Sequence, residues 1–203
     1  MRRAPLMCGL VLVAIVFVPA MVHSQSGQRR STHPSLNSQM GSLKNGTFCE
    51  RTAAIFALHQ QGRRAIPALI SRMDDAELAE DSGDLISNPI ISTRPLGSQN
   101  DYFAGELYAY VLELILGRGT LSREPAHCEF YLTPDDYAYS IGTLRKRGNH
   151  AITATDLPLI KQIYSDWWAA NRKKTLAELQ QDWKQASRPL TRSQFIWQSG
   201  GTP

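Results

Sequence analysis

The sequence predicts an all-α fold in which about six helices form antiparallel pairs joined by long irregular loops. Apolar residues recur at spacings of three and four along most of the chain, which is the period of a helix with one buried face. Capping boxes of the form Thr-x-x-Glu begin at Thr47 and Thr175, and each one satisfies two backbone amides at a helix start. Proline and glycine separate the apolar segments, which is typical of turns and loops.

The N-terminal segment, residues 1–24, has the layout of a secretory signal peptide. Arg2 and Arg3 precede an uncharged apolar run over residues 6–18, which Pro19 ends. We therefore expect cleavage after this segment and a periplasmic or secreted protein. The alternative is an uncleaved membrane anchor, in which case the chain would contact a membrane only through this segment.

The remaining chain has the composition of one domain. Residues 25–42 are rich in Ser, Gln, Arg and Asn, so we expect a disordered leader. Residues 43–198 are predicted to form a single helical domain, followed by a loose tail over residues 199–203.

Charge does not favour a nucleic-acid partner. The formal net charge of +4 includes two arginines of the signal segment, and their removal leaves about +2. The basic clusters at residues 63–64, 145–147 and 172–174 are separated in sequence. We interpret them as solvated helix ends, and the alternative is a patch for a polyanion or a membrane surface.

Two cysteines remain after removal of the signal segment, which contains Cys8. In an oxidising compartment, Cys49 and Cys128 have one possible pairing. That disulfide would close a loop of about 80 residues and stabilise the fold by about 4 kcal/mol. The alternative is two separately buried thiols.

The first predicted helix runs from the cap Thr47 to Gly62, and the second carries Pro67 in its first turn. Because the linker is short, we expect these helices to be antiparallel neighbours. Residues 49–75, with Pro67 near the start of the second helix and Asp74 and Asp75 after its end, resemble a HEAT-type helical repeat. The resemblance implies a HEAT-like N-terminal hairpin and a scaffold or binding role.

A long loop over residues 87–100 precedes the third helix, and such loops are often functional. Arg94 in this loop and Tyr102 just after it are candidate partner-binding residues. Asn100 or Asp101 is expected to cap the third helix, which is apolar on more than one face and therefore central. Glycines at 117 and 119 should end it, with one in the left-handed conformation.

The C-terminal half is predicted to contain three more helices. A short strand at residues 129–132 precedes a fourth helix over residues 133–148. The fifth helix begins at residues 156–158 and ends near Asn171, and the sixth runs from Thr175 to Pro189. An aromatic segment at residues 195–197 should then pack back on the domain.

All four tryptophans lie in the C-terminal part of the chain. We interpret this aromatic set as core, and the alternative is a ligand platform, since large flat rings also dominate interfaces. Trp168 and Trp197 are therefore further candidate binding residues. The histidines lack metal-ligand spacing, and no phosphate-binding or hydrolase motif is found, so we expect no metal, cofactor or catalytic residue.

These observations favour an exported, non-catalytic binding or scaffold protein of the bacterial envelope or periplasm, with a protein partner. One alternative is a periplasmic inhibitor or immunity-type protein that uses the loop at residues 87–100. Another is an enzyme with a cleft formed by that loop and the aromatic C-terminal face.

Overall fold

A computed structural model divides the chain into two units, Met1–His33 and Pro34–Pro203. The structure describes residues 35–79, 102–117, 121–124, 129–132, 143–185 and 188–198, all within the second unit. The predicted signal segment, the C-terminal tail, Arg94 and Cys128 lie outside the described residues.

The described part of the chain is predominantly helical, but it is not purely α-helical. Its α-helices are α1 (Leu36–Asn45), α2 (Phe48–Gln61), α3 (Ile66–Ser71), α5 (Ala104–Leu116), α6 (Leu157–Asn171) and α7 (Leu176–Lys184). Two 3-10 turns join them, η1 (Gly62–Arg64) and η3 (Ala154–Asp156). The strands are β1 (Leu78–Ala79), β2 (Tyr102–Phe103), β3 (Leu121–Glu124), β4 (Glu129–Leu132), β5 (Thr143–Lys146), β6 (His150–Ala151) and β7 (Phe195–Gln198). The all-α class was therefore wrong in its strict form.

The strands form three small antiparallel sheets. The strand pairs β1–β2 and β3–β4 are separate, and the third sheet has the order β6-β5-β7. The prediction of a strand at residues 129–132 is confirmed as β4. The fourth helix was predicted to reach Gly148, but residues 143–146 are β5, because they pair with β7 far along the chain. Gly148 and Asn149, both at positive φ, make the turn into β6.

Residues 36–45 form helix α1, which corrects the prediction of a disordered leader up to residue 42. The Ser35 hydroxyl accepts a hydrogen bond from the amide of Ser38 and caps the helix. Met40 and Leu43 are fully buried and Leu36 packs against the core, so a few apolar residues attach this polar helix to the core.

The predicted helix boundaries are confirmed where local signals specify them. Thr47 and Thr175 each form a complete capping box with the glutamate three residues later. Gly62 ends α2 at a φ of 54°, and a proline occupies the first turn of both α3 and α6. The cap of α5 differs from the prediction: the carboxylate of Glu106 accepts from the amide of Phe103, and Asn100 and Asp101 lie outside the described residues.

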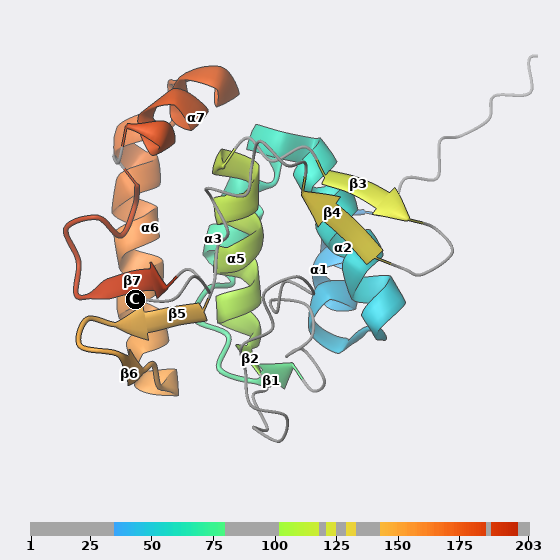
Figure 1. Cartoon of the computed structure of the whole chain (residues 1–203), viewed down its shortest axis with the longest axis horizontal. Helices are drawn as coiled ribbons and strands as arrows, with labels where there is room; N and C mark the ends of the chain where they lie inside the picture. The colour runs from blue at the N-terminus through green and yellow to red at the C-terminus, as the bar shows by residue number, and fades with distance from the viewer. Residues whose placement is uncertain are drawn as a thin grey trace, which may run out of the picture. The chain divides into compact units, whose positions relative to one another are not determined.

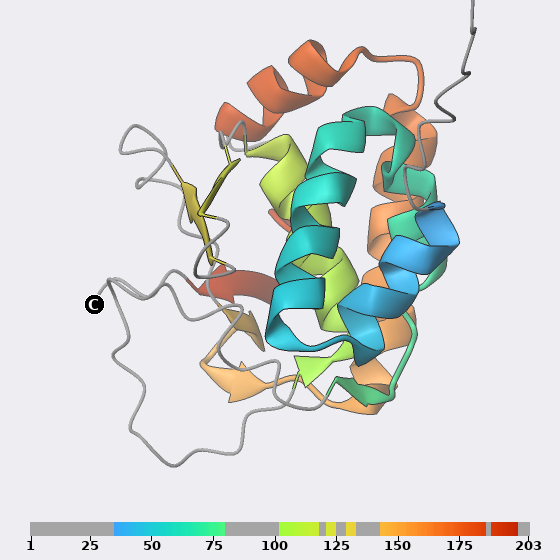
Figure 2. The ribbon, with the colours of Figure 1, turned by 90° about the vertical axis from the view of Figure 1, so that its right-hand side faces the viewer.

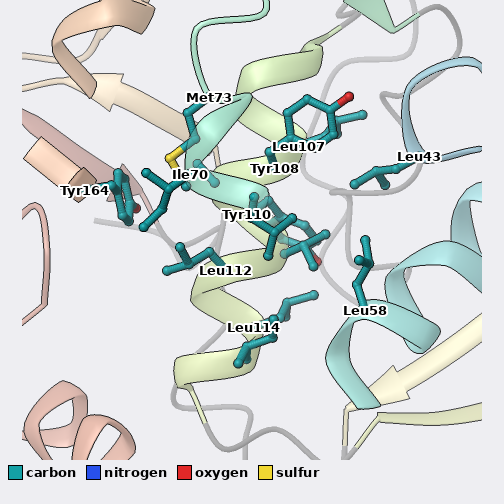
Figure 3. Close-up of a cluster of buried hydrophobic side chains, with 14 of the residues drawn as sticks. Leu43, Leu58, Ile70, Met73, Leu107, Tyr108, Tyr110, Leu112, Leu114 and Tyr164 are labelled. Carbon is teal, nitrogen blue, oxygen red and sulfur yellow. The ribbon is translucent and has the colours of Figure 1, made fainter. Parts of the chain in front are cut away.

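Helix α5 is the central element, as predicted. All of its residues are buried, and α1, α2, α3 and α7 all contact it. Figures 1 and 2 show it with α6 on one side and α1 and α2 on the other. In Figure 3, Ile70, Met73 and Tyr164 lie on one side of α5, and Leu43 and Leu58 lie on the other. Gly117 ends the helix with a φ of −70°, so it does not take the left-handed conformation, and Gly119 lies outside the described residues.

The N-terminal helices contact the core in two groups. Helix α2 packs most extensively against α1, whereas α3 packs against α5 and α6, so the antiparallel packing of α2 on α3 that the short linker predicted is not found. The aromatic segment at residues 195–197 does pack back on the domain, as strand β7. None of the helices in the described ranges is long and apolar enough to cross a membrane.

Candidate functional site

The most deeply buried charged group in the described part of the chain is Glu113, in the middle of α5. Its side chain is 1% exposed. Oε1 accepts a hydrogen bond of 2.6 Å from the hydroxyl of Tyr164 on α6, and Oε2 accepts one of 2.5 Å from Nε1 of Trp183 on α7. The Tyr164 hydroxyl in turn accepts from Nε1 of Trp197 on β7 at 3.1 Å. These four residues, here called the Glu113 network, join four elements.

Burial is the main cause of the pKa shifts in the Glu113 network. It raises the pKa of Glu113 above the ordinary value of 4.5, against the hydrogen bonds from Trp183 and Tyr164 and the charge of Arg188, which lower it. Burial also raises the pKa of Tyr164, and the neighbouring carboxylate raises it further. The guanidinium carbon of Arg188 lies 4.0 Å from the ring centroid of Trp183, so this cation covers the network from the α7 side.

The Glu113 network can hold helices together, but its geometry does not indicate catalysis. Both oxygens of Glu113 are occupied by donors of the protein itself. A general acid or base must instead reach a proton on the substrate. A buried carboxylate with its hydrogen bonds made is the arrangement that avoids the free-energy cost of an unsatisfied polar group. We therefore assign this network to the core.

A second group of interacting residues lies at the C-terminal end of α6, where the side chain of Arg63 from η1 binds the backbone. Its Nε donates to the carbonyl oxygen of Lys174 at 2.9 Å, and a terminal nitrogen donates to the carbonyl oxygen of Arg172. Its guanidinium carbon lies 5.1 Å from the ring centroid of Trp168. One arginine thus binds two backbone carbonyl oxygens in the turn that follows α6, and it lies over one face of a tryptophan.

Arg63 brings together two basic clusters that are far apart in sequence. Arg64, Arg172 and Lys173 are exposed, and their side chains make no ion pair with any residue that the structure describes. The lysines at positions 44, 146, 161 and 174, in contrast, each pair with an aspartate. We call the set of residues at positions 63, 64, 168, 172 and 173 the Arg63 patch.

The predicted binding residues take different places. Trp168 is half-buried and belongs to the Arg63 patch, whereas Trp197 is half-buried and belongs to the Glu113 network. Tyr102 is only 4% exposed, so it was wrong to expect its ring at a binding surface. Arg94 lies outside the described residues. The four predicted residues therefore do not form one site.

Cys49 forms a disulfide bond at the exposed start of α2. Helix α2 contacts β4, which begins directly after Cys128. This arrangement is consistent with the predicted bridge. The pairing itself stays a prediction, because Cys128 lies outside the described residues.

The sequence analysis identified neither Glu113 as the centre of the Glu113 network nor Arg63 as the centre of the Arg63 patch. Glu113 had a recognisable signal, because an acid in the middle of an apolar helix must find buried donors. Arg63 had none, since its acceptors are the backbone carbonyls of residues more than a hundred positions later. The basic clusters were interpreted as separate helix ends, and the fold instead places two of them at one surface.

Within the described ranges, no group of His, Cys, Asp and Glu side chains could hold a metal ion. The candidate site is therefore the Arg63 patch, which can offer cations and an aromatic ring to a partner. No protein-family model, no curated protein sequence and no solved structure matches this chain.

Proposed function

We propose that the protein is an exported, non-catalytic binding protein of the bacterial envelope or periplasm, and that its partner is another protein. The observation that carries this proposal is the Arg63 patch. It combines exposed arginine side chains with a half-buried tryptophan, and these residue types dominate the energetic centres of protein interfaces. The features expected of a signal peptide in residues 1–24 support export.

Three further observations are compatible with this role. Arg63 is immobilised by its hydrogen bonds to Lys174 and Arg172, so part of the surface is already ordered before a partner binds. The resemblance of residues 49–75 to a HEAT-type repeat belongs to the same proposal, because repeats of that type present helix pairs as binding scaffolds. The Glu113 network supports a non-catalytic role, since its acid is used to join helices.

Site-specific photo-crosslinking in the organism that encodes the protein tests the proposal. A photo-reactive residue replaces Arg64 or Lys173 in the patch, and Arg192 on the loop before β7 serves as the control. We expect the same protein to be crosslinked from both patch positions and not from Arg192. The absence of a protein adduct at both patch positions, or equal adducts at all three positions, would contradict it.

Export is tested separately by cell fractionation and by the mass of the purified protein. We expect the protein in the periplasm or the medium, with a mass that lacks residues 1–24. A full-length protein in the cytoplasm would contradict the export part of the proposal.

A further inference from the structure

We propose that the Arg63 patch docks an acidic segment of the partner protein, in which carboxylates flank an apolar side chain. This inference rests on the proposed function and specifies the chemistry of the partner. It follows from what the patch offers: exposed cations at Arg64, Arg172 and Lys173, on the two chain segments that Arg63 joins, and the half-buried ring of Trp168 under Arg63.

Charge complementarity is the first argument. The cations of the patch make no ion pair with any described residue, although elsewhere four lysines are paired with aspartates. The planar guanidinium groups of Arg64 and Arg172 match the geometry of carboxylates, which they can bind with two parallel hydrogen bonds. The partner surface that complements the patch is therefore rich in Asp and Glu.

The ring of Trp168 is the reason for expecting an apolar side chain in the segment that the patch binds. Arg63 lies over this ring, and Trp167 lies beside it with 6.2 Å between ring centroids. Both tryptophans are half-buried and pack against the core, so their exposed parts form a fixed apolar surface. An apolar side chain of the partner can be buried there without ordering new elements of this chain.

The same geometry disfavours an anionic membrane as the ligand. A tryptophan that anchors a protein to a bilayer must insert its ring into the headgroup region. Arg63 lies over one face of the Trp168 ring, and the ring is half-buried against the core, so it cannot insert in this way, although its exposed part can still contact a side chain of a partner.

The test measures binding of a fluorescent glutamate-rich peptide that contains one leucine, and the same peptide with glutamine in place of glutamate is the control ligand. The full mature protein is compared with Arg64→Glu, Lys173→Glu and the matched charge reversal Arg192→Glu. All three positions are exposed, and their side chains make no hydrogen bond or ion pair with any described residue.

We expect each patch variant to weaken binding of the acidic peptide roughly three- to tenfold, while Arg192→Glu leaves it unchanged. Binding should also weaken as salt concentration rises, because the interacting charges are exposed. The glutamine peptide should not bind.

Three results would overturn the inference: no binding of the glutamate peptide by the wild type, equal loss in all three variants, or stronger binding to vesicles of anionic phosphatidylglycerol than to the peptide. Its failure is distinguishable from that of the proposed function. A protein crosslinked from Arg64 and Lys173 together with no binding of acidic peptide would keep the binding role and reject the acidic chemistry.

Discussion

Nε1 of Trp183 donates a hydrogen bond to Oε2 of Glu113 at 2.5 Å, and this bond attaches α7 to the central helix. Tyr164 does the same for α6 through the other carboxylate oxygen. A single buried side chain thus holds two helices that are far from it in the sequence. Removal of this side chain should therefore destabilise the packing of both α6 and α7 on α5.

We predict that Glu113→Ala lowers the free energy of unfolding by about 3 kcal/mol, because two buried donors lose their acceptor. Glu113→Gln should cost less, since one amide oxygen can still accept. Urea denaturation, followed by tryptophan fluorescence, measures both effects. An alanine variant within about 0.5 kcal/mol of the wild type would show that the Glu113 network does not hold the helices.

The raised pKa of Glu113 predicts a specific pH dependence of stability. The folded state holds the proton of this group more tightly than the unfolded state. Its contribution is therefore fully present below the ordinary pKa of 4.5 and is lost as the pH rises through the folded pKa. Wild type should thus lose stability relative to Glu113→Gln over this rise in pH.

Glu178 provides a control of opposite sign for this pH experiment. Hydrogen bonds from the amide and the hydroxyl of Thr175 lower its pKa below 4.5. Its contribution is present above that value and is lost as the pH falls, so wild type should lose stability relative to Glu178→Gln in acid. Denaturation at a series of pH values checks both slopes, and equal slopes for the two variants would contradict the assignment.

Two glycines in helices offer a matched pair for packing. A Cβ on Gly105 would lie 2.2 Å from the carbonyl oxygen of Met73, whereas a Cβ on Gly41 would meet nothing within 4 Å. Gly105→Ala should therefore destabilise by about 2–3 kcal/mol. Gly41→Ala should stabilise by about 0.5–1 kcal/mol, because alanine is the better helix former. Thermal unfolding of both variants checks the difference, and equal melting temperatures would contradict the close approach of α5 to Met73.

We predict that the disulfide of Cys49 joins it to Cys128. Mass spectrometry of a protease digest without reductant should find the two peptides joined, and reduction should separate them. Reduction should also lower the free energy of unfolding by about 4 kcal/mol. Two free thiols in protein isolated from the periplasm would exclude this bridge.

Local signals explain what could be predicted of the fold. The capping boxes at Thr47 and Thr175, the proline in the first turn of α6 and the all-round apolar pattern of α5 each act within one helix. A short window of sequence contains all of that information, so the starts of α2, α6 and α7 were predicted close to their observed positions. The end of α7 was predicted wrongly, because this helix ends at Lys184 and not at Pro189.

Contacts between distant segments explain what could not be predicted. Leu144 fits the helical spacing with Tyr137, yet residues 143–146 become a strand because β7 pairs with them. Helix α1 depends on the burial of Met40 and Leu43 by elements later in the chain. The Arg63 patch required the same kind of information, since its parts lie on η1 and at the end of α6.

The positions of the Glu113 partners have a consequence for the time course of synthesis. Tyr164 and Trp183 follow the acid by 51 and 70 residues. At about 5–20 residues per second, roughly 4–14 s pass between the synthesis of Glu113 and that of Trp183. During that interval the core of the nascent chain cannot close around its acid, so the chain stays available for factors that handle unfolded polypeptides.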